Sequence, residues 1–326
     1  MNYLSSIKRQ LEVGVKTDLF KRESDWYRRC RRNLHQQYVL HAIKTGKRLK
    51  DQAAMMTLDD LEELSKALFL HNDTKSLMDR TLLNNQWLTI GRSSDIGNLL
   101  FSDLHWLDRF LVIDLTRLKV RQQHSISIFC SPGKWAIDPF HSLACQLLAN
   151  PFNASDPVFS QISDSKSDSR IAAHINRVLK NLYESDARAV LTPGLQSHSA
   201  RRGGAAHASG HGDVKLSDLA HRGLWSMDGF ATLLEYISPT SASDQTIAKI
   251  LGGWNDPAKA GLPPTLHCFG HHRHEAHQRV ADFAAAMREL YFAKLSKQTF
   301  ADCLTATLLM YCDDTFALSP AHKIHQ

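Results

Sequence analysis

Apolar residues change their spacing in one short region of this chain, and that change limits the folds open to it. Residues 110–120 and 125–129 are rich in β-branched side chains and alternate in part between apolar and polar residues, which is typical of β-strands. Residues 121–124 between them predict the connection of a hairpin. Because the segments on both sides have helical spacing, the sequence predicts a mainly helical protein with a small antiparallel β-sheet.

Helices are predicted over most of the remaining chain. Thr57 precedes two acidic residues and leucines at helical spacing, so a helix is expected to begin there. A second predicted helix covers about 75–88, and a third begins near Ser93. Asp138 and Pro139 open another over 141–149. Further helical patterns cover 170–187, 197–210, 215–222, 228–237, 243–252 and 271–295. The serine- and aspartate-rich residues 153–169 predict a flexible insertion.

Positive charge is concentrated at one end of the chain. Residues 1–50 hold thirteen Lys and Arg against four Asp and Glu, a net +9, whereas the whole chain of 326 residues sums to +6. A basic arm of this kind predicts a polyanionic partner such as nucleic acid, and a solvated helical face is the alternative. The basic runs at 28–32 and 47–50 would suit nuclear import or DNA contact.

The cysteines and the hydropathy pattern argue against several classes of protein. None of the six cysteines forms a Cys-x-x-Cys pair, so neither a secreted disulfide framework nor a four-cysteine zinc site is expected. No stretch reaches the apolar length of a membrane span, and no signal peptide is visible. The sequence therefore predicts an intracellular protein with reduced thiols.

Candidate functional residues gather around one alanine-rich segment. His198 and Arg201 are three residues apart, so a helix would place both side chains on one face. Trp225 and Tyr236 follow about one helical hairpin later. Arginine, histidine, tryptophan and tyrosine converging on one anion are what phosphodiester chemistry through a tyrosine nucleophile would need.

The chain resembles the catalytic domain of tyrosine recombinases, and more closely its eukaryotic Crypton-type branch, in four separate blocks that occur in the family's order. Residues 90–99 resemble the block with the first catalytic arginine, and residues 116–119 resemble the hairpin with the catalytic lysine. His198-Ser-Ala-Arg201 matches the His-x-x-Arg box, and residues 223–227 followed by 235–237 resemble the His/Trp box and the nucleophile. The resemblance covers about residues 57–255.

The resemblance implies a mainly α fold with a small antiparallel hairpin or three-stranded sheet. It implies a basic helical segment over 1–55, a reduced DNA-clamping domain, and a catalytic domain over 56–326. The implied activity is site-specific DNA recombination through a 3′-phosphotyrosine, in a nuclear protein derived from a mobile element. Double-stranded DNA is the implied partner, bound by a homotetramer on paired sites, with no cofactor, metal or membrane. Six catalytic residues are implied: Arg92, Lys119, His198, Arg201, Trp225 and Tyr236.

Three of these residues would hold the phosphate. A phosphodiester attacked in line gains negative charge on its non-bridging oxygens, and a planar guanidinium donates paired hydrogen bonds to such oxygens. The resemblance gives this role to Arg92 and Arg201. Trp225 would donate its indole N–H to a phosphate oxygen.

The other three would exchange the P–O bonds and transfer the protons. Tyr236 would be the nucleophile, and His198 the base or proton shuttle. Lys119 would protonate the leaving 5′ oxygen, although Arg117 and Arg121 compete for that position. A departure from the family concerns Tyr236, which lies eleven positions after Trp225, whereas bacterial and phage members have nine. The ninth position here is Leu234, which cannot be a nucleophile.

Other interpretations remain open. Each candidate could be structural: a surface cation, a helix cap, or a buried aromatic residue. The whole chain could be a non-catalytic DNA-binding protein, or it could act as a type IB topoisomerase does. The segment 267–277 holds one cysteine and five histidines and could bind zinc, although its spacing does not match His-Glu-x-x-His.

Overall fold

The computed structural model describes Gln10 and residues 24–46, 53–117, 122–151, 156–162, 168–185, 190–225, 241–269 and 274–325. Contacts within the chain divide it into two units, Met1–Gln52 and Ala53–Gln326. In the first unit, α3 (Ser24–Thr45) carries Arg28, Arg29, Arg31 and Arg32 at exposed positions. Its second half exposes apolar side chains, with Tyr38 and Ile43 among them.

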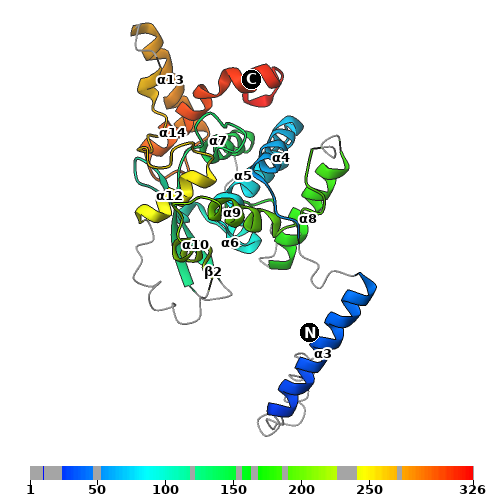
Figure 1. Ribbon diagram of the computed structural model, residues 1–326. Helices are drawn as coiled ribbons and strands as arrows, with labels where there is room; N and C mark the ends of the chain where they lie inside the picture. Colours follow the sequence, from blue (N-terminus) through cyan, green and yellow to red (C-terminus); the bar gives the residue numbers. More distant parts are fainter. Residues whose placement is uncertain are drawn as a thin grey trace. The chain divides into compact units, whose positions relative to one another are not determined.

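The second unit is a mainly helical body with one small sheet (Figure 1). Its α-helices are α4 (Leu58–His71), α5 (Thr74–Leu88), α6 (Ser93–Gly97), α7 (Pro139–Ala149), α8 (Asp168–Glu184), α9 (Ser199–Ser209), α10 (Leu216–Gly223), α12 (Ala242–Leu251), α13 (His274–Leu290), α14 (Gln298–Met310) and α15 (Cys312–Leu318). Single 3₁₀ turns are η1 (Phe101–Asp103), η3 (Leu266–Cys268) and η4 (Lys323–His325). The strands are β1 (Leu104–Trp106), β2 (Leu111–Arg117) and β3 (Gln122–Ile128).

The helix starts follow from their capping residues. Thr57 accepts a hydrogen bond from the N–H of Asp60, and Asp60 accepts one from the N–H of Thr57, so two backbone donors at the start of α4 are satisfied. Asp73 caps α5 by accepting from the N–H groups of Lys75 and Ser76, and Asp138 caps α7 with Pro139 at the first helical position. The helices predicted from Thr57, over 75–88 and after Asp138 are therefore confirmed.

The sheet is antiparallel with the order β1-β2-β3. Leu115 and Ile126 lie on the buried face that the alternating pattern predicts, and Val112 and Ser127 on the opposite face are buried as well. The prediction of a mainly helical fold with a small antiparallel sheet is confirmed. The predicted connection over 121–124 is wrong in part, because residues 122–124 belong to β3 and His124 pairs with Leu115. The three residues of β1 are too few to show alternation, so the sequence analysis did not assign this strand.

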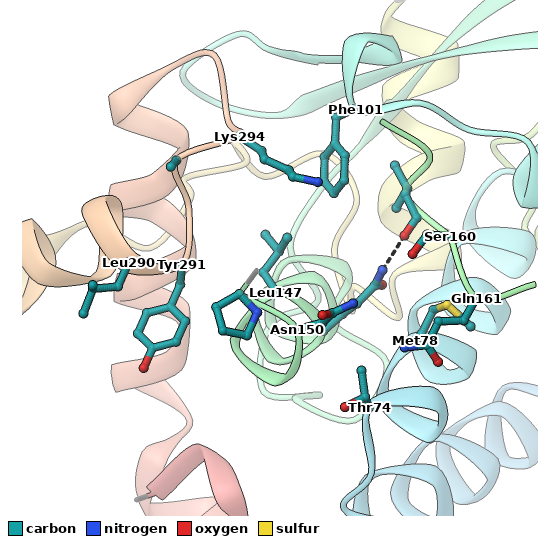
Figure 2. A pocket seen from close by; sticks show the side chains of 14 residues that line it. Thr74, Met78, Phe101, Leu147, Asn150, Ser160, Gln161, Leu290, Tyr291 and Lys294 are labelled. Atoms are coloured by element: carbon teal, nitrogen blue, oxygen red, sulfur yellow. Dashed lines mark hydrogen bonds between the residues drawn. The ribbon is translucent and has the colours of Figure 1, made fainter. Parts of the chain in front are cut away.

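Part of the predicted flexible insertion is packed into the body. Within 153–169, the structure describes residues 168–169, which begin α8, and residues 156–162, in which Val158 and Phe159 are buried. The N–H of Val158 donates to the carbonyl of Leu99 at 2.9 Å, and Nε2 of Gln146 donates to the carbonyl of Val158 at 2.6 Å, which is the dashed line in Figure 2. Two large apolar residues were enough to anchor a segment whose overall composition is that of a loop.

The C-terminal helices add to the core, and Phe300 and Leu304 of α14 belong to it. Helix α14, which the sequence analysis did not assign, packs against α7, and Tyr311 after it donates its hydroxyl to the carbonyl of Ser131 at 2.9 Å. Among the helices that the structure describes, none is long and apolar enough to cross a lipid bilayer.

Candidate functional site

The segment with the His-x-x-Arg spacing lies at the start of α9. His198 is the N-cap residue and is exposed, whereas Arg201 in the first turn is 7% exposed. Small residues let this helix approach the body closely. A Cβ atom on Gly203 would lie 1.9 Å from the carbonyl oxygen of Met56, so only glycine fits at that position.

The Arg201 guanidinium is held by two backbone carbonyls from distant parts of the chain. Nη1 donates to the carbonyl of Ile90 at 2.5 Å, and Nη2 donates to the carbonyl of Gly223 at 2.7 Å. Both acceptors lie at the C-terminal ends of helices, after α5 and at the last residue of α10, where the helix dipole favours a cation. The position of Arg201 is therefore fixed by the backbone before any ligand binds.

Trp225 completes the surroundings of this guanidinium. Its ring centroid is 4.9 Å from the Cζ atom of Arg201, which is a cation–π distance. The indole packs against Gly223, where an added Cβ would lie 2.7 Å from the ring. Leu224 between them has φ 46°, so the chain turns sharply at the end of α10 and returns the ring over Arg201.

Arg92 lies beside this group, at the N-cap of α6. Its backbone N–H donates to Asp95 at 3.1 Å. Ser93 donates its hydroxyl to the carbonyl of Ser197 at 3.2 Å, so the residue after Arg92 is bonded to the residue before His198. Nη1 of Arg92 is buried and has no hydrogen-bond partner among the described residues. A buried donor without an acceptor costs free energy unless a ligand or water supplies one.

The segments that carry four of the six predicted site residues are thus brought together from α6, α9 and the end of α10, with Arg201 and Trp225 in direct contact. The other two lie outside the described residues. Lys119 and its competitor Arg121 belong to the connection 118–121, the side chain of Arg117 is likewise not described, and Tyr236 belongs to the stretch 226–240.

Comparison with solved structures matches this arrangement to known folds. A Flpe mutant in complex with a DNA Holliday junction matches with a TM-score of 0.50 and 14% identity, over 94% of this chain and 73% of that one. A FLP recombinase–Holliday junction complex matches with a TM-score of 0.49 and 15% identity, over 90% of this chain and 71% of that one. The chain has a tyrosine recombinase fold. No protein-family profile matches the sequence. No curated protein matches it either.

A buried ion pair lies next to the end of α10, at Arg222 and Asp244. Arg222 is fully buried and bonds to the carboxylate of Asp244, and its other N–H groups donate to the carbonyls of Leu88 and Ser127. Asp244 in turn accepts from the N–H of Ser127 at 2.8 Å. This network joins α10, α12, β3 and the end of α5. The sequence analysis missed it, because an arginine in a short polar helix has the pattern of a surface residue.

A histidine pair connects the hairpin to α10. The ring of His124 on β3 lies edge-to-face against His221, with centroids 4.6 Å apart, and each residue is 6% exposed. Burial lowers the pKa of His221, and the nearby Arg222 adds to this effect while Asp244 and Asp218 oppose it. His221 also lies four residues before Trp225. The strand that follows the Lys119 connection is therefore packed against the helix that carries the Arg201 acceptor.

The structure describes only part of the histidine-rich segment 267–277. In the described part of the chain, no group of three or more His, Cys, Asp and Glu side chains is placed to hold a metal. The rings of His267 and His277 stack with centroids 6.4 Å apart. Residues 270–273 and the side chains of His274 and Glu275 lie outside the described set.

Proposed function

We propose that this chain cuts and rejoins DNA through a covalent 3′-phosphotyrosine, with Tyr236 as the nucleophile. The recombinase fold supports the reaction class. The observation that carries the proposal is the buried Nη1 of Arg92, which has no acceptor among the described residues. Residues on both sides of Arg92 are bonded to the segment of His198 and Arg201, because Ile90 accepts from Arg201 and Ser93 donates to Ser197. A phosphate oxygen is a strong acceptor for a guanidinium N–H, and it would satisfy Nη1 of Arg92.

The two arginines would act on the transition state. Arg92 and Arg201 would donate to the non-bridging oxygens as these gain negative charge, in a site where the protein has already fixed their positions. Trp225 would cover the Arg201 guanidinium and exclude water from it. Because Arg201 is anchored by Ile90 and Gly223, little reorganisation would accompany the reaction.

The chemical step would balance within the protein and the DNA. The phenolic oxygen of Tyr236 attacks phosphorus, with its proton passing to His198, and a P–O bond to Tyr236 forms. The P–O5′ bond breaks, and Lys119 protonates the leaving 5′ oxygen. Rejoining reverses these steps with a 5′ hydroxyl as the attacking group. The phosphodiester energy is kept in the phosphotyrosine, so the step consumes no nucleotide.

The partners would follow from the same likeness. The matched structures are recombinases bound to Holliday junctions, and we propose that this chain acts on duplex DNA as a homotetramer on paired sites. The basic residues of α3 would add affinity for the backbone. A nuclear location and a Crypton-type, mobile-element origin are part of the same proposal.

Adduct trapping tests the proposal without a known target sequence. The purified chain is mixed with a pool of nicked duplexes of random sequence, whose short strand diffuses away after cleavage and prevents rejoining. We expect a protein–DNA adduct that survives denaturing electrophoresis, in the presence of a chelator, and that is lost in Tyr236→Phe. DNA binding without an adduct would instead support the non-catalytic alternative.

A further inference from the structure

Helix α8 carries an arginine whose orientation is fixed by two buried residues. Nη2 of Arg177 lies 3.0 Å from Nδ1 of His174, and Nε2 of His174 lies 2.6 Å from Oδ1 of Asp79 on α5. The guanidinium has no acceptor lone pair, so Nδ1 must accept and Nε2 must carry the proton donated to Asp79. His174 is 6% exposed and Asp79 is 4% exposed, whereas Arg177 is at an exposed position.

The hydrogen-bonded chain Asp79–His174–Arg177, called the relay below, lies next to the candidate phosphate site. Asn176, adjacent to Arg177, accepts a hydrogen bond from the N–H of Ser197 at 2.7 Å, and Ser197 precedes His198. The helix is also in close contact with α6, because a Cβ on Gly97 would lie 2.6 Å from Ile171. The residue that holds the His198 segment and the oriented arginine are thus neighbours on one helix.

A second arginine, Arg170, lies on the exposed side of α8 along the helix from Arg177. Arg170 lies seven residues before Arg177, which is two helical turns or about 10 Å along the axis, and both positions are exposed. Lys180, one turn further, lies 3.7 Å from Glu184 and is partly neutralised by it. The buried face, with Ile171, Ile175 and Leu179 among its residues, packs on the body.

We propose that Arg177, oriented by Asp79 and His174, and Arg170 bind backbone phosphates of the DNA duplex beside the reacting phosphate. This inference rests on the proposed function. An exposed arginine usually loses side-chain freedom when it binds, and the relay removes part of that cost in advance. The guanidinium fork suits phosphate oxygens, and the arginines would set the position of the duplex on α8 without reading its sequence.

A relay that only stabilised the fold would give different effects on stability and on DNA binding. If the relay only docks α8 on α5, removing the Arg177 side chain changes stability and leaves DNA affinity unchanged. If Arg177 binds a phosphate, its removal weakens DNA binding and lowers the dependence of affinity on salt. Each phosphate contact contributes about 0.9 to the slope of log affinity against log salt concentration.

The test measures binding of a labelled duplex of arbitrary sequence by fluorescence anisotropy over a series of salt concentrations. We expect Arg177→Ala to lower the slope by about 1 and the Arg170→Ala/Arg177→Ala pair by about 2. Arg177→Lys should keep the wild-type slope with weaker binding, because the charge remains and the oriented fork is lost. Urea unfolding of each variant confirms that the fold is retained.

Lys323→Ala is the matched control, since it removes one exposed charge elsewhere. Lys323 lies at one end of α4, because its N–H bonds to Asn72 at the C-terminal end of that helix. The α9 segment of the candidate site lies at the other end, because the N–H of Met56, just before α4, bonds to the carbonyl of Ser199. The slope of log affinity against log salt concentration for Lys323→Ala should equal that of the wild type. Equal slopes for Arg177→Ala and wild type, equal losses in Arg177→Ala and Lys323→Ala, or wild-type affinity in Arg177→Lys would overturn the inference. Absence of DNA binding by the wild type would overturn the proposed function as well.

Discussion

Arg201 donates from Nη1 to the carbonyl oxygen of Ile90, a residue 111 positions earlier whose φ is 49°. A left-handed backbone is uncommon for a β-branched residue, and here it turns the peptide after α5 so that its carbonyl reaches the guanidinium. Leu224, with φ 46°, directly follows Gly223, the second acceptor. Two backbone turns that are costly in isolation therefore surround the same arginine, which is typical of functional sites.

Replacing Arg201 with lysine should lower stability more than the same change at Arg92. One ammonium group cannot reach both carbonyls in the fork geometry, and a buried carbonyl without a partner costs about 1–3 kcal/mol. Nη1 of Arg92 donates no hydrogen bond to the described residues, so Arg92→Lys should change the free energy of unfolding by less than about 0.5 kcal/mol. Urea unfolding measures both. Equal losses would show that the Arg201 anchors contribute nothing specific.

Gly203→Ala should destabilise the protein, whereas Gly212→Ala should not. The methyl group at position 203 would lie 1.9 Å from the Met56 carbonyl oxygen, and α9 would have to move. Overpacking of this kind costs about 1–3 kcal/mol or more. At position 212 nothing lies within 4 Å of the added carbon. Thermal unfolding of both variants compares the same substitution in crowded and open surroundings. A wild-type unfolding midpoint for Gly203→Ala would show that α9 is not closely packed at this position.

The sequence predicted those parts of the fold and site that depend on local signals. The helix starting at Thr57 and the strands around Leu115 follow from capping and alternation, which act over a few residues. The carbonyl anchors of Arg201 could not be predicted, because they join residues 111 and 22 positions apart and depend on backbone turns at Ile90 and Leu224. The Asp79–His174–Arg177 relay joins residues 95 positions apart for the same reason.

Breaking the buried Arg222–Asp244 pair should be among the most destabilising single changes. Asp244→Ala leaves a fully buried guanidinium without its carboxylate and removes the acceptor for Ser127, at a cost of about 3–5 kcal/mol. Lys180→Ala removes an exposed ion pair and should cost less than about 1 kcal/mol. Denaturant titration separates the two. Similar midpoints would mean that the pair is accessible to water.

Stability should fall as the pH is lowered through the histidine range. Burial lowers the pKa of His141, with Arg80 adding to the effect, and burial also lowers the pKa of His322. In both cases the folded chain binds these protons less readily than the unfolded chain, whose histidines have a pKa of about 6.5. The unfolded state therefore takes up protons first, and the stability present above about pH 6.5 is lost below it.

Urea unfolding at about pH 7.5 and about pH 5.5 checks this sign. His322 donates from Nε2 to the carbonyl of Phe69 at 2.8 Å and accepts at Nδ1 from the N–H of Ile324 at 3.3 Å, which requires a neutral ring. The variant His322→Gln should therefore show a smaller loss between the two pH values. A free energy of unfolding that stays constant or rises on acidification would contradict the assignment of neutral buried histidines.

The measurement that tests the central claim is the mapping of the covalent bond. The adduct formed on the random-sequence nicked duplexes is digested with nuclease and protease, and mass spectrometry locates the residual nucleotide on the protein. The proposed function predicts a 3′-linked nucleotide on Tyr236, with adduct yield strongly reduced in Arg92→Ala and Arg201→Ala. A nucleotide on any other residue, or an adduct that persists in Tyr236→Phe, would contradict it.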